Sequence, residues 1–287
     1  MNNIERHIIL NGEIISGSQP VIFHNNRAFC YGDGLFETMH AFGTEILFAE
    51  SHFSRLNKGM TALKMEIPGS ISKEKICREI TRLLNRDKLF GSVCVRLTIF
   101  RDSDGYYTPK QNTIGYLIEC KLLENDYYQL NQKGLSIDIY YDFQKTPGIL
   151  SQFKTCNSAV YILAGISAKE RGLDDCLVLN NRGAIIESSN SNIFLVRKDI
   201  IYTPSLEQGC IDGTMRLQVI SLAKSSAIRV EEITITNENV LLDADEIFLT
   251  NVISGIRWVM AFRQRRYFNK VAKLLCEKLN AEAFIGK

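Results

Sequence analysis

The stretch that most constrains this chain of 287 residues is 152–165, where a lysine lies between a strand-like and a helix-like segment. Upstream, residues 135–141 alternate between apolar and polar positions, which predicts a strand. Downstream, residues 157–171 show a helical pattern whose inward positions are expected to be Val160, Leu163, Ala164 and Ser167. A rigid junction of this kind can present the amine of Lys154 to a carbonyl group, because Schiff-base formation requires a neutral, desolvated lysine. The alternative is a solvated surface lysine, which is the commoner situation.

The bulk composition is that of a soluble globular protein. Hydrophobic residues make up 45% of the chain and charged residues 23%, and the length suffices for one large or two medium domains. The net charge of +2 predicts no nucleic-acid partner. No apolar run approaches the roughly 18 residues of a membrane span, and residues 1–10 lack the pattern of a signal peptide. We therefore expect a cytoplasmic protein without a membrane partner.

The positions of cysteine and histidine limit the chemistry. The eight cysteines form no C-x-x-C pair and several lie in apolar segments, so we expect reduced thiols and no metal site. The four histidines all precede residue 53, so chemistry in the C-terminal part must use another base.

The N-terminal part combines hairpins with helices. Turns at Asn11-Gly12 and Gly43-Thr44 predict two hairpins. A helix is expected over 51–65, and Ser72 can cap a second one. Arg55 lies off the apolar stripe of the first helix, where a solvated surface arginine is the simple interpretation. Further strands are predicted at 92–100 and 113–120.

Two polar segments interrupt this pattern. The loop 101–112 contains two adjacent tyrosines, and it can be either a lid over a binding site or a loop packed on its neighbour. The segment 121–133 has no periodicity and is a candidate linker. We therefore predict an α+β protein with an N-terminal domain over 1–120 and a second domain over 134–287.

Two features of the second domain indicate a site. Glu187 ends an apolar strand, so it should be either paired, because unpaired burial of a carboxylate is costly, or exposed at the strand end. Gly213, Thr214 and Met215 should form the first turn of a helix that buries Leu217, Ile220 and Ala223. The free N–H groups of such a turn can bind an anion, although every helix has this feature.

Six stretches, in this order, resemble the class IV aminotransferase family, the fold-type IV enzymes that depend on pyridoxal 5′-phosphate: YGDGLFET (31–38), HFSRL (52–56), FKTCN (153–157), ESSNSNIF (187–194), IDGTMR (211–216) and FLTNVISGIRWV (248–259). The resemblance spans nearly the whole chain. It implies an N-terminal α/β sandwich-like domain and a C-terminal pseudo-barrel with flanking helices. It also implies a homodimer.

The resemblance also implies roles for individual residues. Lys154 would hold the cofactor as a Schiff base and move the substrate proton, and Glu187 would pair with the pyridine nitrogen. Arg55 would bind the cofactor phosphate. The remaining phosphate contacts would come from Thr214, Met215, Asn251 and Val252, the last of which stands where relatives often carry a hydroxyl side chain.

Three functions follow from the resemblance and stay open at this point. One is amino-group transfer from an amino acid to a 2-keto acid. The second is a 4-amino-4-deoxychorismate lyase, which Thr38 favours because its hydroxyl can assist proton transfer, whereas the loop 101–112 lacks the second arginine of such lyases. The third is a cofactor-binding protein without turnover. Candidate substrate-binding residues are Tyr31, Arg96, Arg101 and Tyr107.

Overall fold

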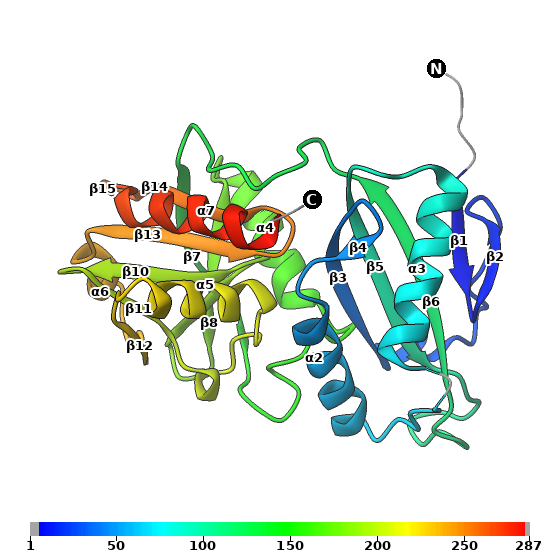
Figure 1. Ribbon diagram of the computed structural model, residues 1–287. Helices are drawn as coiled ribbons and strands as arrows, with labels where there is room; N and C mark the ends of the chain where they lie inside the picture. The colour runs from blue at the N-terminus through cyan, green and yellow to red at the C-terminus, as the bar shows by residue number, and fades with distance from the viewer. Residues whose placement is uncertain (1–5, 70, 285–287) are drawn as a thin grey trace. The chain divides into compact units, whose positions relative to one another are not determined.

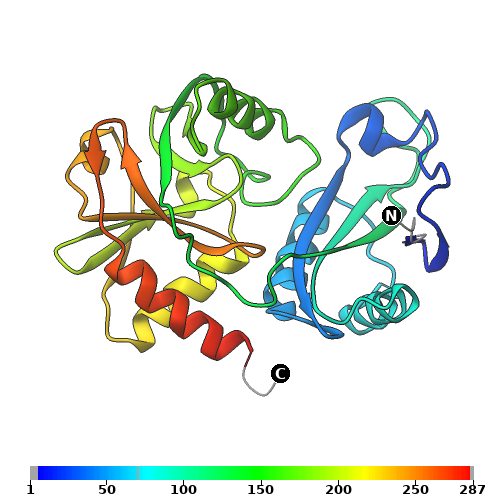
Figure 2. The ribbon, with the colours of Figure 1, turned by 90° about the horizontal axis from the view of Figure 1, so that it is seen from above.

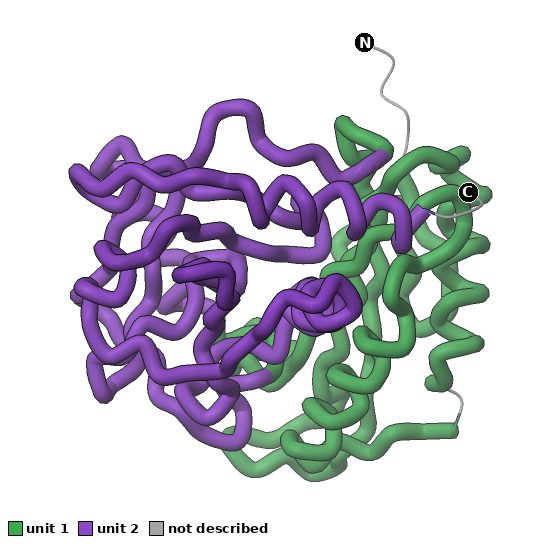
Figure 3. Tube along the Cα trace, turned by 60° about the vertical axis from the view of Figure 1, so that its left-hand side comes forward, with its two compact units in different colours: residues 1–126, 153–157 green, residues 127–152, 158–287 purple. Residues whose placement is uncertain are grey.

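The computed structural model describes residues 6–69 and 71–284. The chain forms two compact units (Figure 3). Unit 1 comprises Met1–Asp126 together with the separate segment Phe153–Asn157, and unit 2 comprises Tyr127–Gln152 and Ser158–Lys287. The first crossing between units falls inside the segment 121–133, and the domain boundaries given above stay a prediction. Lys154 belongs to unit 1 although the chain on both sides of 153–157 belongs to unit 2.

Unit 1 is built on a six-stranded antiparallel sheet in the order β2-β1-β6-β5-β3-β4 (Figure 1). The strands are β1 (His7–Leu10), β2 (Glu13–Ser16), β3 (Gly34–Phe42), β4 (Glu45–Ile46), β5 (Ser92–Arg101) and β6 (Ile114–Leu122). Both predicted hairpins are confirmed. Asn11 and Gly12 both have positive φ values, 52° and 94°, as a two-residue hairpin turn of this type requires.

Helices cover one face of this sheet. These helices are α2 (Ala49–Ala62) and α3 (Lys73–Asp87), and Ser72 caps α3 as predicted; the short α1 (Arg27–Tyr31) precedes β3. The odd-numbered residues of β3 and β5 point toward α2 and α3 and form the core of the unit, which includes Leu35, Met39, Val95, Leu97, Leu56 and Ile80. The even-numbered residues Phe36, Thr38 and Arg96 are half-buried on the opposite face.

Unit 2 is built on a mixed, curled sheet in the order β12-β11-β10-β13-β14-β7-β8-β9, with β15 beside β14. The strands are β7 (Leu135–Lys145), β8 (Asp175–Asn180), β9 (Ile185–Ser188), β10 (Asn192–Arg197), β11 (Ile200–Pro204), β12 (Val230–Ile233), β13 (Glu246–Asn251), β14 (Gly255–Phe262) and β15 (Arg265–Arg266). The N–H of Ile185 donates to the carbonyl of Ile235 at 2.9 Å, which connects β9 to the chain just after β12. The two ends of the strand order therefore meet, and the predicted pseudo-barrel is confirmed.

Helices flank the curled sheet on two sides. α5 (Thr214–Ser225) and α7 (Lys270–Ala283) lie side by side, and α4 (Ala159–Glu170) lies on the opposite side of the unit (Figure 2). The short α6 (Asn239–Leu242) and a 3-10 turn at Leu206–Gln208 complete the unit. The barrel interior is filled by side chains such as Ile137, Leu177, Ile193, Leu249 and Val259. Both units combine strands and helices, so the predicted α+β class is confirmed.

The predicted buried faces of two helices are partly wrong. Leu163 of α4 is 42% exposed and Leu217 of α5 is 39% exposed. In α4 the buried positions are Val160, Ala164 and Ala168, because a stripe of small residues lets the helix lie close to the sheet. The strands β11 and β12 were not predicted. Within residues 6–69 and 71–284, no helix has the length and apolar character that crossing a membrane requires.

Candidate active site

Lys154 is held by backbone contacts to the first residues of β3. The N–H of Phe36 donates to the carbonyl of Lys154 at 2.8 Å, and the N–H of Cys156 donates to the carbonyl of Gly34 at 3.0 Å. The segment thus extends the edge of the unit 1 sheet beside β3 and places its side chains alternately on the two faces. Phe153 packs into the helix-covered core, so Lys154 points to the other face.

The face that carries Lys154 also carries two other predicted residues. The amine of Lys154 lies 4.7 Å from the centre of the Phe36 ring, and the guanidinium of Arg96 lies 4.1 Å from the same ring. Arg96 is the direct cross-strand neighbour of Thr38, whose side chain lies on the same face as that of Phe36. The structure therefore brings Lys154 and Arg96 together around one aromatic ring, with Thr38 on the same face of the sheet.

Arg55 is not a surface residue, and the simple interpretation of a solvated arginine is wrong. Its side chain is 7% exposed and binds the carboxylate of Glu37, with Nε donating to Oε1 at 2.8 Å and Nη2 donating to Oε2 at 2.5 Å. His52 also binds this carboxylate through Nδ1, which lies 2.7 Å from Oε2. Burial alone would raise the pKa of Glu37, but the charge of Arg55 and the hydrogen bonds from His52 and Arg55 lower it to about 2.

Arg101 lies at the base of the loop 101–112 and is 6% exposed. Its guanidinium donates to Asp33 Oδ2 at 2.9 Å, to Asn112 Oδ1 at 2.6 Å and to the carbonyl of Leu63 at 2.7 Å. Burial acts to raise the pKa of Asp33, but the hydrogen bonds and charges of Arg101 and Arg27 lower it below its ordinary value. These contacts tie down the loop, and the predicted role of Arg101 in substrate binding finds no support in them.

The two tyrosines predicted to bind substrate meet at the tip of this loop. The rings of Tyr31 and Tyr107 lie 5.6 Å apart, and Tyr107 is 90% exposed. Arg27 donates to the carbonyls of Gly105 and Tyr106, which fastens the loop to α1. In this structure the loop is thus packed on its neighbour, which was one of the two predicted alternatives.

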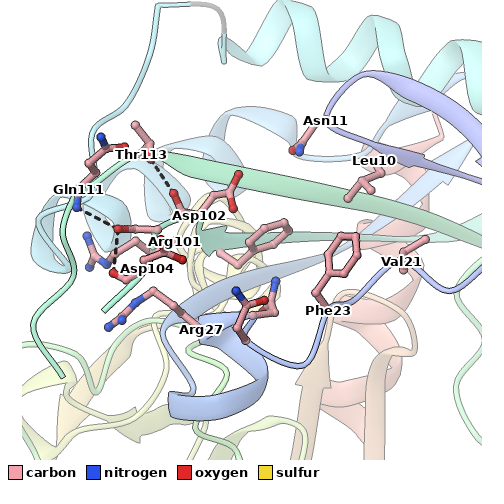
Figure 4. A pocket seen from close by; sticks show the side chains of 14 residues that line it. Leu10, Asn11, Val21, Phe23, Arg27, Arg101, Asp102, Asp104, Gln111 and Thr113 are labelled. Carbon is pink, nitrogen blue, oxygen red and sulfur yellow. Dashed lines mark hydrogen bonds between the residues drawn. The ribbon is translucent and has the colours of Figure 1, made fainter. Parts of the chain in front are cut away.

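A polar cavity of about 490 Å³ lies behind the base of the loop. It is lined by the loop itself, by the β1–β2 turn and by the segment before α1, as Figure 4 shows for Asn11, Phe23, Arg27, Asp102 and Gln111. Several of its polar groups are hydrogen-bonded within the chain. Thr113, for example, donates to the carbonyl of Asp102, and the N–H of Gln111 donates to Ser103. The cavity is a feature of loop packing and holds neither Lys154 nor Thr38.

Glu187 is buried in unit 2 and is paired, which was one of the two predicted alternatives. Its Oε1 accepts hydrogen bonds from Lys145 Nζ at 2.9 Å and from the hydroxyl of Tyr161 at 2.8 Å. Its Oε2 accepts from the N–H of Ile211 at 2.9 Å. Burial and the charge of Glu187 together raise the pKa of Tyr161, so this hydroxyl stays a donor. The result is a buried carboxylate on β9 whose two oxygens are held in place by three donors.

The N-terminus of α5, where the sequence predicts an anion site, lies within the same unit. The helix begins at Thr214 with Gly213 as its N-cap, without a side-chain cap and without an acidic residue in its first turn. A Cβ atom on Gly213 would lie 1.9 Å from Asn192 Oδ1, so only glycine lets this amide approach. The N–H groups of Thr214 and Met215 are among the first of the helix, and the helix dipole favours an anion there.

Asn251 and Val252 form the predicted turn after β13. The side chain of Asn251 accepts from the N–H groups of Ile253 and Ser254 at 3.0 and 2.8 Å. Its amide donates to Ser191 Oγ at 3.0 Å, in the turn between β9 and β10. Asn251 thus orders the backbone around Val252, whose predicted contribution is its N–H group.

Sequence reasoning assigned no role to four residues of these clusters: Lys145, Tyr161, Glu37 and His52. Lys145 ends β7 and Tyr161 lies in the first turn of α4, and nothing in their local pattern shows that both reach Glu187. Glu37 carried a detectable signal, because it is an acidic residue at an inward position of an apolar strand. Such a residue must have a buried partner.

The fold is that of the fold-type IV enzymes. The branched-chain amino acid aminotransferase of Thermobaculum terrenum, solved in its PLP-bound holo-form, superposes with a TM-score of 0.84 at 19% identity over 98% of this chain and 95% of that one. The sequence profile of the family described as amino-transferase class IV matches residues 34–262. The chain belongs to this family, as predicted. It is accordingly an enzyme of the class IV aminotransferase type.

Curated relatives within the family carry out more than one reaction. The chain is 26% identical over 281 residues to a putative branched-chain-amino-acid aminotransferase of Methanocaldococcus jannaschii, covering 95% of this chain and 93% of that one. It is 27% identical over 255 residues to an aminodeoxychorismate lyase of Bacillus subtilis, covering 87% and 84%. The similarity therefore defines the family and leaves the reaction to be argued from residues.

Proposed function

We propose that this protein is a pyridoxal 5′-phosphate-dependent aminotransferase that moves the amino group of an amino acid to a 2-keto acid. The observation that carries the proposal is the buried carboxylate of Glu187. A carboxylate offers about four lone-pair sites, and the described residues supply three donors to this one, from Lys145, Tyr161 and Ile211. A buried acceptor of this kind suits the N–H of a protonated pyridine ring.

The residues present fit the cofactor. The first turn of α5 has no acidic residue and no side-chain cap, which suits a phosphate group at its N–H groups, and Arg55 is the proposed cationic partner of that phosphate. When bound, the cofactor condenses with amino groups and accepts the electrons released at the substrate Cα. Lys154 is proposed to supply the amine that holds it.

Each protein group has a defined task in this proposal. Lys154 takes a proton from the substrate Cα and returns it at another carbon, which a flexible amine beside the flat Phe36 ring can do. Arg96, whose side chain is 43% exposed, is the proposed partner of a substrate carboxylate. It lies 3.7 Å from Glu119, an exposed pair that a bound carboxylate can replace at small cost.

Lyase activity is the second candidate, and one residue favours it. Thr38 places a hydroxyl on the face that carries Lys154, where it can assist protonation of a leaving pyruvate unit. The buried position of Arg101 favours transfer instead. That guanidinium is bound to Asp33, Asn112 and the carbonyl of Leu63, so the single arginine of the loop 101–112 is already held by the protein and is poorly placed to bind a second substrate carboxylate.

A screen of amino donors and keto acceptors tests the proposal. Transfer predicts that the visible absorbance of the bound cofactor bleaches with amino acids and returns with 2-keto acids. Release of pyruvate and 4-aminobenzoate from aminodeoxychorismate without an acceptor would show the lyase instead. Absorbance that no donor changes would show a binding protein without turnover.

We further propose that the protein is cytoplasmic, as its composition predicts, and that it is a homodimer, as the resemblance to the family implies. Sedimentation equilibrium of the purified chain tests the oligomeric state, and a monomer at assay concentrations would contradict it.

A further inference from the structure

Glu37 is a carboxylate in the core of unit 1. It lies on the helix-covered face of β3 between Leu35 and Met39, and it is 2% exposed. Burial of an ionised group is costly unless its partners are well placed. A specific role should therefore explain why a carboxylate occupies this buried position. The resemblance of the motif YGDGLFET to the family assigns no role to Glu37.

The geometry of the Glu37–Arg55 pair fixes the plane of the guanidinium. Nε and Nη2 donate to the two different oxygens of the carboxylate, at 2.8 and 2.5 Å, in a bidentate arrangement. Because a guanidinium is planar and its donors are rigidly spaced, fixing this edge also fixes the direction of the remaining N–H groups.

His52 also holds the carboxylate of Glu37, through one hydrogen bond from a second direction. It lies three residues before Arg55 on α2, so both side chains reach the same strand from one helix face. Burial lowers the pKa of His52 and the charges of Arg55 and Lys154 lower it further, against the opposing effect of Glu37. The neutral ring then donates Nδ1–H to Oε2 of Glu37 at 2.7 Å.

We propose that Glu37 is a positioning residue, which orients Arg55 for binding the phosphate group of the cofactor while His52 fixes Glu37. The inference rests on the proposed function, because that proposal assigns the phosphate to Arg55. It adds a specific role for two residues outside direct contact with the ligand. It predicts that Glu37 discriminates a phosphorylated pyridine aldehyde from the same aldehyde without phosphate.

A merely stabilising ion pair would behave differently. Its loss would weaken the binding of both aldehydes alike or would change unfolding alone. A positioning role instead affects the ratio of the two affinities, because pyridoxal forms the same bond with Lys154 but has no phosphate for Arg55 to bind.

The test measures the dissociation constants of pyridoxal 5′-phosphate and pyridoxal for the full-length apoprotein by absorbance titration. Glu37→Gln keeps the size of the side chain and removes its charge. We expect it to reduce the preference for the phosphorylated aldehyde by about 10- to 100-fold. Arg55→Gln removes the guanidinium itself and should therefore cause the largest loss of this preference. The double variant should lose no more of the preference than Arg55→Gln alone.

Glu79→Gln is the matched control. Glu79 is also a buried carboxylate of unit 1, 5% exposed, and accepts hydrogen bonds from the hydroxyl of Tyr116. Its replacement should leave the affinity ratio within about twofold. Should Glu37→Gln fold poorly, His52 supplies an independent pair of variants. His52→Leu removes the donor and should lower the ratio by about 3- to 10-fold, whereas His52→Asn retains an N–H donor and should preserve it.

Two results would overturn the inference alone. One is an unchanged ratio in both Glu37→Gln and His52→Leu, and the other is an equal loss of affinity for both aldehydes. Failure of the wild-type chain to bind either aldehyde would overturn the proposed function, and the inference with it.

Discussion

The buried carboxylate of Glu37 should make the stability of this protein depend on pH, and Glu37→Gln should remove this dependence. Its pKa falls from an ordinary 4.5 to about 2 in the folded chain. A group with a lowered folded pKa stabilises the fold above its unfolded pKa. That contribution is lost as the pH falls toward the folded pKa.

The magnitude follows from the size of the shift. Each pKa unit corresponds to about 1.4 kcal/mol, so the shift of Glu37 corresponds to roughly 3 kcal/mol at neutral pH. Glu37→Gln should therefore destabilise the chain by an amount of this order at pH 7. The difference from wild type should shrink as the pH falls below about 4.5, and it should nearly disappear at about pH 2.

Urea unfolding of both chains at several pH values measures this difference. Circular dichroism is the suitable signal, because Trp258, the single tryptophan, lies in unit 2 whereas Glu37 lies in unit 1. Glu79→Gln again controls for the replacement of a buried carboxylate by an amide. A stability difference between wild type and Glu37→Gln that stays constant from about pH 6 to about pH 3 would refute the reasoning.

Three further substitutions test the remaining clusters. Lys145→Met leaves the buried Glu187 without its cationic partner and should lower the unfolding free energy by about 3–5 kcal/mol; an unchanged melting temperature would contradict this pairing. Gly213→Ala places a methyl group against the Asn192 amide, which must move, so the affinity for pyridoxal 5′-phosphate in absorbance titration should fall by about tenfold or more; unaltered affinity would show that Asn192 yields freely. Lys154→Ala should abolish turnover and the visible cofactor absorbance while the melting temperature stays nearly unchanged, and retained turnover would remove Lys154 from the mechanism.

Local signals in the sequence account for most of the fold. The Asn11-Gly12 turn, the Ser72 cap and the alternation of 92–100 depend on a few neighbouring residues, and the structure confirms each of them. The strands β11 and β12 lie beside each other in parallel, which depends on partners distant in sequence. Leu163 and Leu217 were predicted to be buried but are exposed. A helical pattern shows which side of a helix is apolar, but not how much of that side the neighbouring elements cover.

For the candidate site, too, the sequence predicted some features and not others. The six motifs identified the family, and with it the residues to which contacts with the cofactor are assigned. The partners of those residues could not be predicted, because Lys145 lies 42 positions from Glu187 and the two residues belong to different strands, β7 and β9. The interpretation of Arg55 as a surface residue failed for a similar reason, since its partner Glu37 belongs to another element.

The segment 153–157 has a consequence for dissecting this protein. It completes the edge of β3 and adds Phe153 to the core of unit 1, yet the chain enters it from unit 2 and returns to unit 2 afterwards. A fragment ending at residue 126 would therefore expose the backbone of Gly34 and Phe36 along a bare strand edge, which invites aggregation. No single cut in the chain separates the two units completely. A fragment that contains unit 1 should therefore extend past Asn157, or the segment 153–157 should be supplied as a peptide.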